Sequence, residues 1–408
     1  MLIVRSILAD KESVLSIASQ AINLFIPIAI MLLINDKYGS HAVVKYEVVL
    51  SLIAFFSVFQ DFSTSYLFTY RRFSKKICFK YFCTIVSFKL TASIICSILL
   101  CFLYVFLGGD PFNYFMAFAV LILSSFDVPL IFFSEGKSYL HSFLYALKSF
   151  SCFIFILIGL DVFLALFLSC LCFSILIFFN YYKKGESKFY ISKRIFVFLF
   201  KKYKTVTLTE TITAIFSQLD SYLVSAVANE KTVFIYVSIR KAIRASNVVM
   251  NYLFRISFTR YKSDNENWKI PIYLILIIST FIIICLNLFG ESIFIMYADI
   301  NYDSNILKLT IFTQSMILLV GSLKSIIRNI YFFANSKFKE HLLFTVISSA
   351  VFIIPLYVAS SNSLALDAAE LSFYRVMTDV IYLLLFLILL IVVFLRKKNN
   401  ETIGGFKK

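Results

Sequence analysis

Apolar stretches of about 20 residues, long enough for an α-helix to cross a hydrocarbon core of roughly 30 Å, recur along almost the whole chain of 408 residues. Backbone N–H and C=O groups find no partner in lipid, so such stretches span a membrane as α-helices. Charged residues make up only 15% of the chain and hydrophobic residues 60%, which excludes an ordinary soluble protein. We predict an all-α membrane protein with about twelve transmembrane helices, at residues 13–34, 43–66, 82–106, 112–133, 139–159, 161–182, 205–228, 232–254, 270–290, 305–333, 340–359 and 366–395.

Basic residues are unevenly distributed among the predicted connections. The formal net charge is +16, and most of the 39 Lys and Arg residues fall in connections on the side of the N-terminus or in the basic ends of the chain. The opposite connections contain only Lys37 and Lys231. The positive-inside rule therefore predicts that both termini are cytoplasmic. Because the charge follows the membrane topology, it does not indicate a nucleic-acid partner.

A long basic connection divides the predicted spans into two sets of six. We expect an N-terminal six-helix bundle over residues 1–182, a basic amphipathic linker over 183–204, a C-terminal six-helix bundle over 205–396 and a basic tail over 397–408. The linker composition suits a short helix in the headgroup region. Two halves with similar connection charges are typical of transporters, so we predict two bundles around a central cavity.

Several basic residues lie inside the predicted spans. Lys45 and Lys308 are close to span ends and can extend toward the headgroups. The others lie deeper, where each charge costs about 2.5 to 3.5 kcal/mol unless water or a partner faces it. These deeper residues are predicted to line a cationic, substrate-binding cavity: Lys89, Lys148, Arg240, Lys241, Arg244, Lys324, Arg328 and Arg375.

The spacing of the polar residues supports a hydrated cavity. On a helix, Arg240, Arg244, Asn247 and Asn251 fall on one face, because their separations of three or four residues return to the same side. Gln20 and Asn23 share a face of the first span in the same way. We predict that Gln20, Asn23, Asn247 and Asn251 form the polar lining of this cavity.

The acidic residues inside the spans leave two interpretations open. Asp127, Glu210, Asp220 and Asp379 could form structural ion pairs, for example Asp220 with Arg240 or Arg244, or they could couple transport to protons or sodium. Because these acids are fewer than the deep basic residues, we expect the cavity to remain cationic. At the cytoplasmic end of the second span, Asp61 is predicted to form a latch with Arg71 or Arg72.

A cationic cavity favours an anionic ligand. The planar guanidinium of Arg matches the oxygens of a phosphate or pyrophosphate, and two or three such contacts could hold a diphosphate out of bulk water. There is no Walker loop and no His or Cys cluster with metal-ligand spacing, so we expect no cofactor, no metal and no ATP hydrolysis by this chain.

Short motifs extend along the whole chain: Gln20 and Asn23, Asp61-Phe62 followed by Arg71-Arg72, Lys89-Leu90, Pro129 to Phe133 followed by Glu135-Gly136-Lys137, and Asp220 with Glu230, Tyr236 and Arg240. Their pattern resembles the Wzx-type O-antigen flippases of the multidrug/oligosaccharidyl-lipid/polysaccharide (MOP) exporter superfamily. Ser63 and Phe234 stand where that family often has Gly.

The resemblance implies a non-enzymatic transporter in the bacterial inner membrane. Its substrate would be an undecaprenyl-pyrophosphate-linked O-unit, moved from the cytoplasmic to the periplasmic leaflet by alternating access. Membrane lipids and other O-antigen assembly proteins, namely a polymerase and a chain-length regulator, would be partners. Two alternatives are an O-antigen polymerase, which should carry reactive groups in a large periplasmic loop, and an ion-coupled exporter of small amphiphiles, which should have an acidic cavity.

Overall fold

The computed structural model is helical throughout the part of the chain it describes, with no strand among these residues. The described residues are 11–61, 75–107, 111–128, 138–182, 193, 197, 201, 204, 207–214, 220–262, 269–298, 303–333, 337–362, 364 and 366–405.

The first helical element contains two predicted spans. Helix α2 (Lys11–Asp61) is interrupted at Gly39, where φ is 80° and ψ is 174°. Glycine adopts positive φ without the steric penalty of a Cβ atom, so the chain turns there and a second helix begins. The next elements are α4 (Lys75–Leu107), α5 (Pro111–Leu123), the 3-10 turn η1 (Ser124–Phe126), α7 (Ser138–Leu157) and α8 (Val162–Tyr182).

The second half of the chain continues the helical pattern. With α2 counted as two, the described residues form twelve α-helices. Eight described helices are long and apolar enough to cross a membrane. The expected all-α, multispan membrane architecture is therefore confirmed. The remaining elements are α10 (Asp220–Ser225), α11 (Glu230–Lys262), α12 (Lys269–Ala298), α13 (Ser304–Ile327), the π-helical segment η3 (Arg328–Phe333), α14 (Phe338–Ser361) and α15 (Ala368–Gly405).

The chain forms two compact units. Unit 1 comprises residues 1–252 and 294–300, and unit 2 comprises residues 253–293 and 301–408. Within the expected linker, the described residues Lys193, Val197, Lys201 and Lys204 are helical and exposed. The division into bundles at 183–204 stays a prediction.

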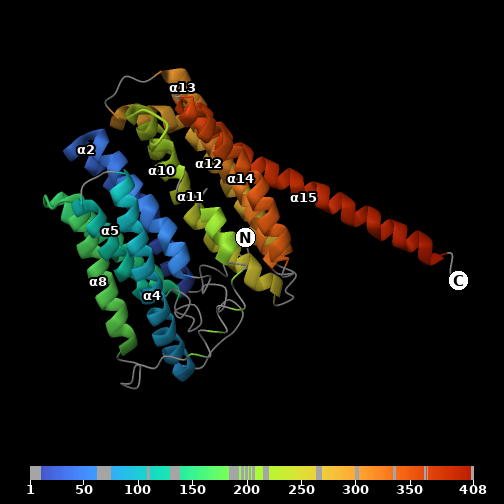
Figure 1. Cartoon of the computed structure of the whole chain (residues 1–408), viewed down its shortest axis with the longest axis horizontal. Coiled ribbons are helices and arrows are strands. Elements are labelled where there is room, and N and C mark those ends of the chain that lie inside the picture. Colours follow the sequence, from blue (N-terminus) through green and yellow to red (C-terminus); the bar gives the residue numbers. More distant parts are fainter. Residues whose placement is uncertain are drawn as a thin grey trace. The chain divides into compact units, whose positions relative to one another are not determined.

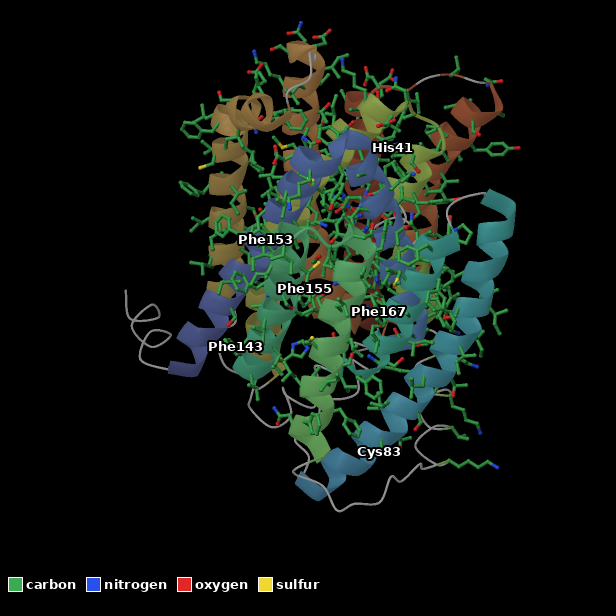
Figure 2. The ribbon with its side chains drawn as sticks, turned by 90° about the vertical axis from the view of Figure 1, so that its left-hand side faces the viewer. His41, Cys83, Phe143, Phe153, Phe155 and Phe167 are labelled. Atoms are coloured by element: carbon green, nitrogen blue, oxygen red, sulfur yellow. The ribbon has the colours of Figure 1, made fainter. Side chains whose placement is uncertain are left out.

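Each unit is built by helices that pack through apolar faces. In unit 1, α2 packs against α4, α5 and α7, and α8 packs against α5 and α7 (Figure 1). His41, just after the Gly39 turn, and Cys83 on α4 lie toward opposite ends of this unit (Figure 2). In unit 2, α15 packs against both α13 and α14. These contacts bring charged residues that are distant in sequence onto facing helices.

Candidate functional site

Three buried charged clusters occur among the described residues, and the first lies in unit 1. We name it the Asp220 cluster: Asp220, Arg240 and Arg244. Asp220 is completely buried at the first residue of α10. Arg240 Nε donates to Asp220 Oδ2 at 2.7 Å, and Arg244 Nη2 pairs with Asp220 Oδ1. Because one carboxylate faces two guanidinium groups, this cluster carries one formal positive charge.

A second acid of unit 1 is paired next to this cluster. Lys241 Nζ lies 2.5 Å from Glu47 Oε1, on the second helix of α2, and Glu47 is buried. Glu47 was not among the predicted buried acids, although it lies within the second predicted span. Its apolar neighbours, Tyr46 and Val48, were the available signal that it lies inside the span.

The second cluster connects four elements of unit 1. We name it the Lys89 cluster: Lys89, Asp61, Asp127 and His141. Lys89 Nζ lies 2.9 Å from Asp61 Oδ1 and donates to the Asp127 carbonyl oxygen at 2.7 Å. Asp127 Oδ1 is 2.8 Å from His141 Nε2. These contacts join α2, α4 and α7 to the segment that follows η1.

The described partner of Asp61 is therefore Lys89. Arg71 and Arg72 lie outside the described residues, so the cytoplasmic latch stays a prediction. Gln60, next to Asp61, donates through Nε2 to Ser93 Oγ and Ser125 Oγ, each at 2.7 Å. This buried network fixes the second helix of α2 against α4 and η1.

Other predicted site residues of unit 1 occupy less charged surroundings. Lys148 Nζ lies over the rings of Tyr145 and Phe173, at 5.2 and 5.4 Å from their centroids, which is cation–π geometry. Asn23 is buried and its Nδ2 donates to the Ser142 carbonyl oxygen at 3.4 Å. Glu210 lies in the helical segment 207–214 and is partly exposed. Gln20 lies in α2 and Asn247 and Asn251 lie in α11, but their side chains are outside the described residues.

The third cluster lies in unit 2. We name it the Asp379 cluster: Asp379, Lys324 and Arg375. Lys324 Nζ on α13 is 2.7 Å from Asp379 Oδ1 on α15, and Arg375 Nη1 is 3.4 Å from Asp379 Oδ2. A Cβ atom added at Gly321 would lie 3.5 Å from Asp379 Oδ2, an ordinary van der Waals contact, so Gly321 lies directly beside the carboxylate. Arg328, one turn after Lys324, begins η3.

A buried histidine adjoins the Asp379 cluster. Tyr382 Oη lies 2.7 Å from His341 Nδ1, and the Phe332 ring stacks on the imidazole at a centroid distance of 5.4 Å. Lys324 Nζ lies 4.9 Å from the Tyr382 ring centroid. The sequence did not predict this arrangement. The histidines are scattered in sequence, and Tyr382 is an uncharged residue in an apolar span, so neither indicates a buried polar contact.

The two units differ in the balance of their buried charge. In unit 1 the deep basic residues are matched by as many acids, once Glu47 and Asp61 are included. In the described part of unit 2, Lys324 and Arg375 share the carboxylate of Asp379, so the Asp379 cluster carries one formal positive charge. The cationic cavity itself stays a prediction. The described residues contain no group of three or more His, Cys, Asp or Glu side chains that could hold a metal ion.

Comparison with solved structures identifies the architecture. The model matches an inward-facing MATE-family multidrug resistance transporter of the MOP superfamily over 95% of this chain and 99% of that one, with a TM-score of 0.62 and 12% identity. An outward-facing MATE transporter matches with a TM-score of 0.61 and 14% identity, over 95% and 97% of the two chains. The lipid II flippase MurJ, in an inward closed conformation, matches with a TM-score of 0.62 and 13% identity, over 93% and 87%.

The chain shares its fold with these two MATE transporters and with MurJ. No protein-family model matches the sequence, and no curated protein matches it either. At 12 to 14% identity, a shared fold does not show which residues contact a ligand. The buried charges of this chain are therefore the guide to its function.

Proposed function

We propose that this protein is a flippase for an anionic, lipid-linked glycan, specifically an undecaprenyl-pyrophosphate-linked O-unit. The observation that carries the proposal is the positive charge of the Asp379 cluster, where Lys324 and Arg375 share one buried carboxylate, Asp379. The MOP fold supports it, because the fold also belongs to a lipid II flippase.

Charge balance favours an anionic substrate over a cationic one. A cation deep in a bilayer costs about 2.5 to 3.5 kcal/mol, so an unmatched surplus persists only where it meets water or a ligand. A diphosphate provides the missing negative charge, and guanidinium groups bind its oxygens through paired donors. An opposite charge at 4 Å contributes about 4 kcal/mol at an effective dielectric of 20, so one diphosphate would offset the surplus.

The clusters of unit 1 have a second role in this proposal. Arg240 is buried on Asp220, whereas a quarter of the Arg244 side chain is exposed. Arg244 is therefore the accessible donor for the substrate, and Arg240 holds Asp220 in place. Lys89 and Lys241 are paired with Asp61 and Glu47 and add no net charge, whereas Lys148 lies over two aromatic rings, which do not neutralise it.

Alternating access of the two halves would carry the substrate from the cytoplasmic to the periplasmic leaflet of the bacterial inner membrane, with both termini cytoplasmic. Membrane lipids surround the path, and the polymerase and chain-length regulator of O-antigen assembly would receive the product. Asp127, Asp220, Asp379 and Glu210 are the candidates for ion coupling.

An exporter of small amphiphiles is the second candidate function, because the same fold belongs to multidrug MATE transporters. It predicts an acidic rather than a basic interior, which the charge of unit 2 disfavours. The polymerase alternative has less support, because helix α12 runs to Ala298 and α13 begins at Ser304, which leaves little room for a large catalytic loop there.

Complementation of a flippase-null strain tests the proposal. Surface O-antigen would be measured for R375A, K324A and R328A at matched membrane abundance, with K45A as the control because Lys45 is an exposed lysine on α2. We expect loss of surface polymer in R375A and K324A, a similar loss in R328A, and full polymer in K45A. Full complementation by all three of the arginine and lysine variants R375A, K324A and R328A would contradict the proposed anion site.

A further inference from the structure

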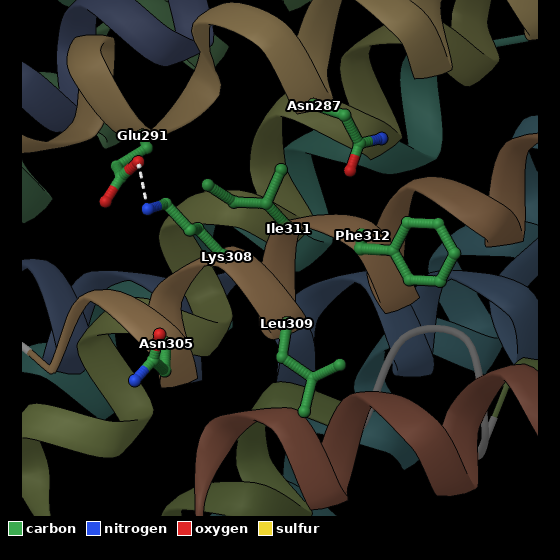
Figure 3. Close-up of a pocket in the computed structure, with 7 residues that line it drawn as sticks. All are labelled: Asn287, Glu291, Asn305, Lys308, Leu309, Ile311 and Phe312. Atoms are coloured by element: carbon green, nitrogen blue, oxygen red, sulfur yellow. Dashed lines mark ion pairs between the residues drawn. The ribbon is translucent and has the colours of Figure 1, made fainter.

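A pocket of about 410 Å³ lies between α12 and α13 of unit 2, at the end that the sequence predicts to be periplasmic. Figure 3 shows its two chemically different ends. Glu291, Lys308 and Asn305 lie at one end, and Phe312 and Asn287 lie at the other, with Leu309 and Ile311 between them. The pocket therefore has a charged end and an uncharged, largely apolar end within one small volume.

The charged end presents both signs of charge. Lys308 Nζ lies 3.3 Å from Glu291 Oε2, and Ser304 Oγ donates to Glu291 Oε1 at 2.5 Å. The Lys308 side chain is 60% exposed and the Glu291 side chain 25% exposed, so both groups can reach a ligand. This end of the pocket carries no net charge from Glu291 and Lys308, which disfavours a purely anionic ligand and favours one that carries both signs.

The apolar end continues onto a lipid-exposed surface. Leu309 and Phe312 are about half exposed, and Leu288 and Phe289 on the adjoining helix are 67% and 58% exposed. Helix α12 is largely unburied along its apolar span. A soluble ligand would gain nothing from this surface, whereas acyl chains would cover it.

The geometry points to a binding site for a zwitterionic phospholipid whose headgroup carries a primary ammonium. The headgroup ammonium donates to Glu291, the phosphate accepts from Lys308, and the acyl chains lie along Leu309 and Phe312. A primary ammonium has three N–H donors, whereas a quaternary trimethylammonium has none, so the site should distinguish phosphatidylethanolamine from phosphatidylcholine. The site does not depend on the proposed transport activity, because it needs only the membrane.

Photocrosslinking in liposomes tests this assignment. The full chain would carry p-benzoyl-phenylalanine in place of Phe312, in vesicles with equal amounts of phosphatidylethanolamine and phosphatidylcholine, and bound lipid would be identified by mass spectrometry. The matched control places the same probe at Phe115, which is 63% exposed near the start of α5 and outside any charged pair. We expect the ratio of ethanolamine to choline adducts to be about threefold higher at 312 than at 115.

Three variants identify the groups responsible. E291Q should lower the ratio at position 312 to the control value, while E291D should retain the preference and show that the loss does not arise from misfolding. K308M should reduce adducts of both lipids at 312, because both carry a phosphate. Equal ratios at the two probe positions, or an unchanged ratio in E291Q with a normal gel-filtration profile, would overturn the site.

Discussion

Removing the charge of Asp220 is expected to destabilise unit 1 strongly. D220N would leave Arg240 and Arg244 facing each other without a carboxylate, where Arg240 is 4% exposed and Asp220 is fully buried. Removing one partner of a buried ion pair costs about 3 to 5 kcal/mol, since the remaining charge stays desolvated. Each kcal/mol shifts the thermal unfolding midpoint of a domain of this size by about 2 °C or more, so the midpoint of D220N should be roughly 6 to 10 °C below that of the parent chain.

The buried cysteines of unit 1 supply the assay. Cys83, Cys152 and Cys170 are free and buried, so a thiol-reactive dye reports their exposure when the purified protein is heated in detergent. E230Q is the matched control, because Glu230 is a half-exposed acid whose partner is His41, and it should unfold within about 1 °C of the parent chain. The triple variant D220N/R240Q/R244Q removes all three charges and should unfold at a higher temperature than D220N.

A D220N midpoint equal to that of E230Q would refute the reasoning. It would mean that the two guanidinium groups do not depend on Asp220, either because water reaches them or because they find other partners. A triple variant that is less stable than D220N would contradict the charge argument as well, because it would assign the stability to packing.

Three further predictions concern local features. G39A should lower the same midpoint, because φ 80° with ψ 174° is a region essentially limited to glycine and costs other residues about 1 to 3 kcal/mol. G39N should be destabilised to a similar extent, because Asn tolerates the left-handed helical region but not this one. Y382F removes the bond to His341 and should cost about 0.5 to 1.5 kcal/mol, measured by gel filtration after heating, with F373L, an exposed position, unchanged. E47Q should leave the Lys241 ammonium without its carboxylate partner and lower the free energy of unfolding by about 3 kcal/mol, measured by the dye assay. Recovery of the midpoint in E47Q/K241M would confirm that the lysine charge is responsible.

Local sequence patterns were sufficient to predict an all-helical membrane fold. Length and apolarity define the spans, and the turn between the first two falls at Gly39, whose positive φ requires glycine. The same-face argument for Arg240 and Arg244 is consistent with both side chains meeting Asp220.

Local sequence patterns could not predict which charged residues pair when they are far apart in the sequence. Lys241 and Glu47 are separated by 194 residues and meet only because α2 and α11 lie in one unit. The pairing of Lys89 with Asp61 likewise depends on the packing of α4 against α2. Helical periodicity specifies which face a residue occupies but not which helix it faces, so the charge balance of each unit could not be obtained from the sequence.

The most direct test of the central claim is lipid flipping by the purified protein. Proteoliposomes would contain a fluorescent undecaprenyl-pyrophosphate-linked oligosaccharide, and a membrane-impermeant quencher would measure how much reaches the opposite leaflet. The account predicts rapid transfer by the parent chain, at least tenfold slower transfer by R375A, and unchanged transfer by K45A. Equal transfer by the parent chain, R375A and protein-free liposomes would contradict it.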